Sequence, residues 1–215
     1  MSAEPLTLVC FAVKEETRSF KELVASRPDV KTLLTGIGPR NAEKAIRAAI
    51  TARKPGLVLS CGFAGGLRPG LVSGAVVFNA DRESGLEPAL LAAGAQPARF
   101  HFVPQVATTA EEKQLLWNTT GADAVEMESQ IICTVCREQK IPSAIVRVIL
   151  DTAEEDLPLD FNRLMNNRQE MDYDKLAVAL VKSPGKIGSL LRLQKQSQAA
   201  AEKLARVLAE ALTRI

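Results

Sequence analysis

Two segments of the chain place carboxylates beside apolar runs, in a pattern that suits acid–base chemistry. The first is residues 124–129 (AVEMES) and the second is residues 146–151 (VRVILD). Apolar runs of this kind predict buried strands, so we expect Glu128 and Asp151 to project from strand ends into a cleft. Two carboxyl groups that share a cleft suit the cleavage of a glycosidic bond, because one can hold a proton while the other stays ionised.

Two further features follow expected strands in the same way. Glu16 comes after the apolar run 6–13, and the Gly-rich segment 62–66 (GFAGG) comes after the run 57–60. We expect Glu15 to face solvent, and we expect the Gly-rich segment to form a tight turn that lets a phosphate or a water approach the backbone. Ligands of open α/β sheets bind beyond the carboxyl ends of the strands, so these features are predicted to converge with the two carboxylates above.

The elements that position these residues alternate between strand and helix. Such alternation predicts an α/β fold with three α/β/α layers and a mostly parallel, mixed central sheet, in a single domain that spans residues 1–215. Residues 79–124 show no clear pattern outside one helix. The expected strands are 6–13, 32–35, 57–60, 74–78 and 142–150, and the expected helices are one near 14, then 41–53, 110–117, 129–139 and a long C-terminal helix at about 184–215.

Composition narrows the class of protein. The chain has 215 residues, of which 47% are hydrophobic, and this length suits one large domain with a substantial core. The net charge of +2, without a basic run interleaved with aromatic residues, argues against a nucleic-acid partner. The sequence shows neither a secretion signal nor a transmembrane segment, so we expect a cytoplasmic protein that acts on a small molecule.

The cysteines predict a reduced protein without a metal. Cys133 and Cys136 have the spacing of a redox or zinc-ligand pair, but no second pair accompanies them, and His101 is the only histidine. Cys10 and Cys61 lie in apolar runs and are expected in the core. We therefore expect buried structural cysteines, no metal and no cofactor.

The sequence resembles the nucleoside phosphorylase and nucleosidase superfamily, and within it most closely the methylthioadenosine/S-adenosylhomocysteine nucleosidases. The similarity covers roughly residues 6–162, with a gap in the middle. Its most specific part is the pairing of VEME with the Arg-x-x-x-Asp pattern that ends at Asp151. The matching segments, in chain order, are 11–16 (FAVKEE), 35–38 (TGIG), 55–67 with its Gly-rich part, and 125–128 (VEME) followed by Asp151.

Features of the C-terminal region resemble one branch of that superfamily. These are Asp156-Leu-Pro158, Ser183-Pro-Gly185 and the long helix from Ser189. They are similar to the hopanoid-associated phosphorylases, which are thought to cleave adenine from an adenosyl group carried on a hopane lipid. The resemblance thus implies an adenine nucleoside with a large substituent at the 5′ position.

The resemblance also implies roles for single residues. Asp151 matches the acid that protonates purine N7, and Glu16 matches the carboxylate that activates the attacking water. Glu128 matches the residue that accepts hydrogen bonds from the ribose 2′- and 3′-hydroxyls, which a carboxylate can do with both at once. The candidate catalytic residues are Asp151 and Glu16, and the candidate substrate-binding residues are Glu128, Met127, Glu126, Phe63, Gly62 and Phe161.

The chain departs from the family pattern in places that bear on specificity. Phe63 stands where related nucleosidases have a hydroxyl residue, and Leu150 stands where a serine often precedes the acid. The segment between Phe78 and Glu126 is also short, and it lacks a clear equivalent of the residues that sandwich the base. We therefore expect an apolar mouth to the site, which favours an apolar 5′ substituent.

The predicted function is release of the free base from a purine nucleoside, by hydrolysis or by phosphorolysis. Glu16 favours hydrolysis, whereas Arg40 and Arg147 could either hold phosphate as a co-substrate or form surface salt bridges. The alternatives are a nucleoside-binding protein without chemistry and a dinucleotide enzyme, although the 62–66 segment lacks the G-x-G-x-x-G spacing. The apolar stripe of the C-terminal helix packs on its own domain or, as in the resembling family, supports a homo-oligomer, a dimer or a multiple of one.

Overall fold

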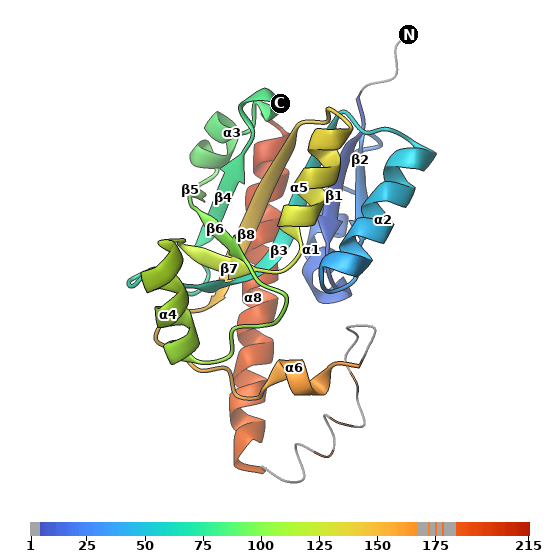
Figure 1. Cartoon of the computed structure of the whole chain (residues 1–215). Helices are drawn as coiled ribbons and strands as arrows, with labels where there is room; N and C mark the ends of the chain where they lie inside the picture. Colours follow the sequence, from blue (N-terminus) through green and yellow to red (C-terminus); the bar gives the residue numbers. More distant parts are fainter. Residues whose placement is uncertain (1–4, 167–171, 173–174, 176–177, 179–183) are drawn as a thin grey trace.

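A mixed β-sheet forms the centre of the protein, whose structure is a computed structural model that describes residues 5–166, 172, 175, 178 and 184–215. Among these residues the sheet has eight strands in the order β2-β1-β3-β8-β4-β5, and β7 joins β3 to β6 beside this path (Figure 1). The strands are β1 (Thr7–Phe11), β2 (Val30–Leu34), β3 (Leu57–Gly66), β4 (Val76–Ala80), β5 (Gln96–Pro97), β6 (Phe100–Phe102), β7 (Ala124–Glu126) and β8 (Ser143–Asp151).

Parallel pairing dominates the middle of the sheet. β1 runs parallel to β2 and β3, and β3 runs parallel to β8. β4 is antiparallel to β8, and β7 is antiparallel to the end of β3. This arrangement confirms the predicted mostly parallel, mixed sheet. Because β1, β3 and β8 point the same way, the residues that follow them meet at one edge.

Helices cover both faces of the sheet, which confirms the three layers. One face packs its core against α1, α3 and α8, and the other packs a smaller core against α2 and α5. Figure 1 shows α2 and α5 on one side of the sheet and α8 on the opposite side. The helices are α1 (Lys14–Leu23), α2 (Pro39–Ala52), α3 (Glu87–Ala92), α4 (Ala110–Thr120), α5 (Ser129–Glu138), α6 (Phe161–Leu164) and α8 (Ile187–Leu212), with 3-10 turns η1 (Arg82–Ser84) and η2 (Pro184–Lys186).

The Gly-rich segment 62–66 is not the turn that the sequence suggested. β3 continues through it, and its residues pair with β8 in register, Gly62 opposite Arg147 and Phe63 opposite Val148. The register shifts only between Ala64 and Gly65. The glycines therefore serve a strand that other side chains approach closely, rather than a reversal of the chain.

The second half of the apolar stripe of α8 is buried against its own domain. Leu204, Leu208 and Leu212 belong to the core cluster on that face of the sheet. The second half of the stripe therefore packs on its own domain, and a role of the first half in a homo-oligomer stays a prediction. Leu191, in the first half of the helix, is 56% exposed. In the part of the chain that the structure describes, no helix is long and apolar enough to cross a membrane.

Two leucines of α8 should therefore respond differently to truncation. We predict that Leu208→Ala lowers the free energy of unfolding by about 2–5 kcal/mol, because it leaves a cavity in the core. Leu191→Ala, the same change on the exposed part of the same helix, should stay within about 0.5 kcal/mol of the wild type. Urea unfolding followed by circular dichroism measures both, and equal losses for the two variants would contradict the packing of α8.

Candidate active site

A buried arginine lies at the centre of the carboxylates. Arg147 sits in the middle of β8, and its side chain is 1% exposed. Its Nη2 forms an ion pair with the carboxylate of Glu126, and it donates to Oγ of Ser129 at 2.8 Å and to Oγ of Ser60 at 3.3 Å. Burial by itself would lower the pKa of Arg147, but the surrounding carboxylates outweigh it and the pKa is raised. Arg147 is therefore an internal cation and not a surface salt bridge.

Glu126 joins this arginine to the start of α5. Its carboxylate accepts from the backbone N–H of Glu128 at 3.1 Å and from the N–H and hydroxyl of Ser129 at 3.0 Å each. These N–H groups belong to the first turn of the helix, which has no internal partners for them. Both oxygens of Glu126 are thus engaged by the protein. Glu126 was predicted to contact the substrate, but in the structure it binds Arg147 and the first turn of α5.

Glu128 stands at the N-terminal cap of α5 with one oxygen held and one near the arginine. Oε1 accepts from the N–H of Gly38 at 2.8 Å, and Oε2 lies 3.7 Å from Nη2 of Arg147. Burial raises the pKa of Glu128 to about 7, against the opposing effect of Arg147. Its carboxyl group therefore changes charge near neutral pH, which is the behaviour of a group placed for function and not only for helix capping.

Glu16 is held by three backbone N–H groups, two from the residues that follow β1 and one from β3. It is in the first turn of α1, where Oε2 accepts from Ala12 at 2.9 Å and from Val13 at 3.1 Å. Oε1 accepts from Phe63 in β3 at 2.8 Å. Burial raises the pKa of Glu16, and Arg147 opposes that rise. Its carboxylate is therefore fixed in space by the backbone.

The neighbouring acid behaves as the sequence led us to expect. Glu15 is exposed, whereas Glu16 is 4% exposed. On the first turn of a helix, adjacent residues point about 100° apart, so one of the two can face solvent while the other enters the site. The expectation that Glu15 faces solvent is thus confirmed.

Gly62 lets the acid and the arginine meet over the backbone of β3. Its φ is +146°, and a Cβ built there would lie 2.5 Å from Oε1 of Glu16 and 2.6 Å from Nη1 of Arg147. Any side chain would therefore displace one of the two. The sequence led us to expect that a phosphate or a water approaches the backbone at Gly62. In the structure, the side chains of Glu16 and Arg147 approach it instead.

Asp151 ends β8, four residues after Arg147. The register between β3 and β8 shifts just before it, between Ala64 and Gly65, so Asp151 does not continue the regular alternation that includes Arg147. Asp151 pairs with Gly65, and a Cβ built on Gly65 would lie in ordinary van der Waals contact with Oδ2, at 3.5 Å. Burial raises the pKa of Asp151.

Lys113 of α4 is a site residue that sequence reasoning missed. Its side chain is fully buried and forms an ion pair with Oδ2 of Asp151. It follows Glu111 and Glu112 in a charged stretch, which is the usual pattern of a solvated helix face. No local signal marks it, because its partners lie far along the chain.

The other candidates lie at the margins of these clusters. Phe63 and Leu150 pack against the core on the α8 side of the sheet, so they do not form the expected apolar mouth. Phe63 reaches the site only through its backbone N–H. Phe161 is half-buried at the start of α6.

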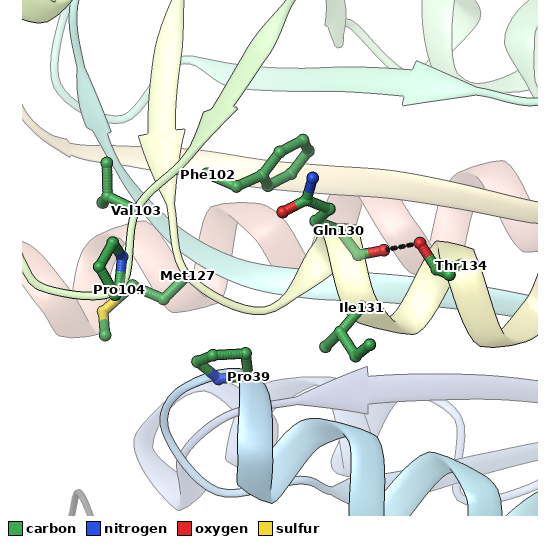
Figure 2. A pocket seen from close by; sticks show the side chains of 8 residues that line it. All are labelled: Pro39, Phe102, Val103, Pro104, Met127, Gln130, Ile131 and Thr134. Atoms are coloured by element: carbon green, nitrogen blue, oxygen red, sulfur yellow. Dashed lines mark hydrogen bonds between the residues drawn. The ribbon is translucent and has the colours of Figure 1, made fainter.

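Met127 lines an apolar cavity that adjoins Glu128. The cavity has a volume of about 330 Å³, and Figure 2 shows side chains from β6, α2 and α5 around it. Its lining includes Pro39 and Met127, which are the chain neighbours of Gly38 and Glu128, the two ends of one hydrogen bond. The full lining is Pro39, Phe102, Val103, Pro104, Met127, Gln130, Ile131 and Thr134.

The cysteines of the described part of the chain are free thiols. No group of three or more His, Cys, Asp or Glu residues there could hold a metal ion. Burial raises the pKa of Cys133 to about 11 and that of Cys136 to about 12, so both thiols keep their protons at neutral pH. A thiolate, which either chemistry requires, is thus disfavoured.

Comparison with known proteins agrees with this architecture. Residues 102–182 match the family model described as the Phosphorylase superfamily. The structure is similar to the 5′-methylthioadenosine/S-adenosyl homocysteine nucleosidase of Helicobacter pylori, with a TM-score of 0.72, 14% identity, and 98% of this chain and 99% of that chain covered. The corresponding nucleosidase of Neisseria meningitidis, in complex with methylthio-immucillin-A, gives a TM-score of 0.71 at 18% identity, with coverage of 98% and 100%.

A second kind of enzyme shares the fold. The futalosine hydrolase of Helicobacter pylori gives a TM-score of 0.66 at 16% identity, and the alignment covers 95% of this chain and 98% of that chain. At these identities the solved structures establish the fold. Together with the family match, they confirm the resemblance to the nucleoside phosphorylase and nucleosidase superfamily. The hopanoid-associated branch stays a prediction.

A methyl group at Gly62 should disrupt the site from within. We predict that Gly62→Ala separates Glu16 from Arg147 and destabilises the fold by roughly 1–3 kcal/mol, through overpacking and backbone strain. Gly70→Ala is the matched control, because Gly70 also has a positive φ, of +80°, but no atom lies within 4 Å of its added Cβ. Thermal unfolding compares the two variants. An equal loss of stability in both would show that the approach of Glu16 and Arg147 to Gly62 does not determine the cost of the substitution.

Proposed function

We propose that this protein, which has the fold of the phosphorylase superfamily, is an enzyme that cleaves the N-glycosidic bond of a purine nucleoside and releases the free base. One observation carries the proposal: Glu128 and Asp151 are buried carboxyl groups with raised pKa values, the first beside Arg147 of β8 and the second at the end of the same strand. A buried carboxyl group whose pKa is raised is a candidate for proton transfer. The fold and the family match support the same reaction.

The chemistry divides between the two ends of the site. Asp151 would give a proton to purine N7, which makes the base a better leaving group. Departure of the base leaves an oxocarbenium-like sugar, which nearby carboxylates stabilise. Glu128 would accept from the 2′- and 3′-hydroxyls, and Glu16 would take a proton from the attacking water. The three hydrogen bonds to Glu16 fix the direction in which that water is activated.

The electrostatics of the site favour hydrolysis over phosphorolysis. A phosphate ion near the sugar would meet Glu16 and Glu128, which repel it when they are ionised. Arg147, which the sequence offered as a phosphate ligand, is buried and already balances carboxylates. Arg40 is exposed at the start of α2. We therefore propose water as the acceptor.

We further propose an adenine nucleoside with an apolar 5′ substituent. The cavity beside Met127 supports this choice, because most of its lining is apolar and it adjoins the residue assigned to the sugar. Burying apolar ligand surface there yields about 25 cal/mol per Å². We therefore assign the contact with the apolar 5′ substituent to this cavity instead of to Phe63 and Leu150.

A nucleoside-binding protein without chemistry is the alternative. The ion pair between Lys113 and Asp151 favours it, since a nearby cation lowers the pKa of an acid and so opposes its protonation.

A homo-oligomer is also proposed, on the ground of the resemblance alone, and sedimentation at micromolar concentration would test it.

The decisive experiment incubates the protein with adenosine, 5′-methylthioadenosine, inosine and longer 5′-alkylthioadenosines, each with and without phosphate. We expect free base from the adenine nucleosides, at rates that rise with the size of the 5′ group and do not depend on phosphate. Tight binding without base release would support the alternative. A rate that requires phosphate would overturn hydrolysis, and a flat or falling series would overturn the apolar 5′ preference.

Replacing the proposed acid should stop base release and spare binding. In Asp151→Asn the amide can still hydrogen-bond to the purine but has no acidic proton, so we predict a fall in kcat of about 10²–10⁴-fold with a small change in Kd. Isothermal titration of the nucleoside measures binding separately. Turnover close to that of the wild type would remove Asp151 from the reaction.

Glu128 should make ribose binding depend on pH. The carboxylate forms as pH rises through its pKa of about 7, and only the ionised group accepts from both hydroxyls, so affinity for adenosine should increase across that range. Calorimetry on the Asp151→Asn variant avoids turnover during the measurement. The matched ligand 2′-deoxyadenosine should show a smaller increase.

The variant Glu128→Gln provides the control for that titration. It should lose about 1.5–3 kcal/mol of binding to adenosine and show no change in affinity across the same pH range. Equal losses for adenosine and 2′-deoxyadenosine would place Glu128 outside the sugar site.

A further inference from the structure

Lys113 is the most completely buried charged side chain that no part of the proposed reaction uses. It lies in the first half of α4, and its side chain is 0% exposed. Its Nζ donates to the carbonyl oxygens of Thr152 at 2.9 Å and Glu155 at 2.6 Å, and it contacts Oδ2 of Asp151. The ammonium group has three donors, of which two meet these carbonyl oxygens, and its charge is paired with the Asp151 carboxylate. The geometry therefore accommodates a charged lysine, which would be too costly to bury without partners.

The start of α4 is braced against the segment that follows Asp151. The N–H of Ala110 donates to Oδ1 of Asp156 at 2.7 Å, and the N–H of Leu157 donates to the carbonyl of Thr108 at 2.8 Å. A capping box between Thr109 and Glu112 fixes the first turn of the helix. Lys113 thus approaches Asp151 from a rigid support.

We infer that Lys113 is a positioning residue for Asp151, which it holds by Oδ2 and whose ionised form it stabilises. The catalytic role of this contact rests on the proposed function, whereas the contact itself does not. When Asp151 gives its proton, the carboxyl O–H bond breaks, an N7–H bond forms on the purine, and the electron pair of the glycosidic bond passes to the base. The carboxylate that remains is then paired with the Lys113 ammonium.

The charged surroundings of Asp151 allow the sign of this effect to be stated. Lys113 on α4 lowers the pKa of Asp151, and Glu155 on the following segment raises it, while burial raises it most. The neighbouring strands contribute uncharged residues, Gly65 of β3 and Val125 of β7. Removal of the lysine charge should therefore move the titration of Asp151 to higher pH.

The test follows Asp151 directly and needs no substrate. The protein is labelled at the aspartate carboxyl carbons with ¹³C, and the Asp151 signal is identified by its loss in Asp151→Asn. We expect Lys113→Met and Lys113→Gln to move the titration to higher pH by about one unit or more, and Lys113→Arg, which keeps the charge, to remain close to the wild type. An unmoved titration in the neutral variants, or an equal shift in Lys113→Arg, would overturn the inference.

A measurement on the wild type keeps the inference open to refutation if the neutral variants do not fold. The ¹⁵N signal of the Lys113 ammonium should respond at the pH where Asp151 titrates, and no response would contradict the pairing.

The kinetics of base release test whether this pairing affects catalysis. In Lys113→Met, kcat should fall more than KM changes, and the alkaline limb of the pH profile should move to higher pH; a limb that stays in place would reduce Lys113 to a structural residue. If no nucleoside is cleaved by the wild type, the proposed function fails while the carboxyl titration still decides the inference.

Discussion

The structure of the site depends on one buried cation. Arg147 brings Glu126 into direct contact and keeps Glu128 and Glu16 near it, although three carboxylates in one place would otherwise repel each other. Removing one partner of such a buried pair commonly costs 3–5 kcal/mol, because the other charge is left uncompensated. The arginine therefore allows acids to gather where a substrate with hydroxyl groups could use them.

The backbone is shaped to suit this cation. Gly62 has no side chain where Glu16 and Arg147 approach each other, and Glu126 uses its remaining capacity to hold the start of α5, which in turn carries Glu128. The site thus links β1, β3, β7 and β8 through side chains as well as through the sheet. Asp151, at the end of β8, has its own cation in Lys113. Two separate charge-balanced groups are therefore attached to β8.

Sequence reasoning succeeded where burial leaves a local pattern and failed where contacts are long-range. The apolar runs that became β1, β3 and β8 predicted the sheet, and the placement of Glu16 and Asp151 after them followed from topology. The glycines of 62–66 suggested a turn, but their purpose is to admit side chains from other elements. Lys113 and the inward role of Glu126 could not be predicted, because nothing near them in sequence reveals their partners. Phe63 and Leu150 were assigned to the wrong surface because a strand residue's face depends on register with its neighbours.

The central claim is that a nucleoside lies between the Arg147 cluster and Asp151. A crystal structure of the Asp151→Asn variant with adenosine tests it most directly. We predict that purine N7 lies within hydrogen-bond distance of the amide at position 151 and that both ribose hydroxyls contact Glu128. A nucleoside bound elsewhere would contradict the account, for example in the groove of about 580 Å³ that Arg99, His101 and Arg137 help to line.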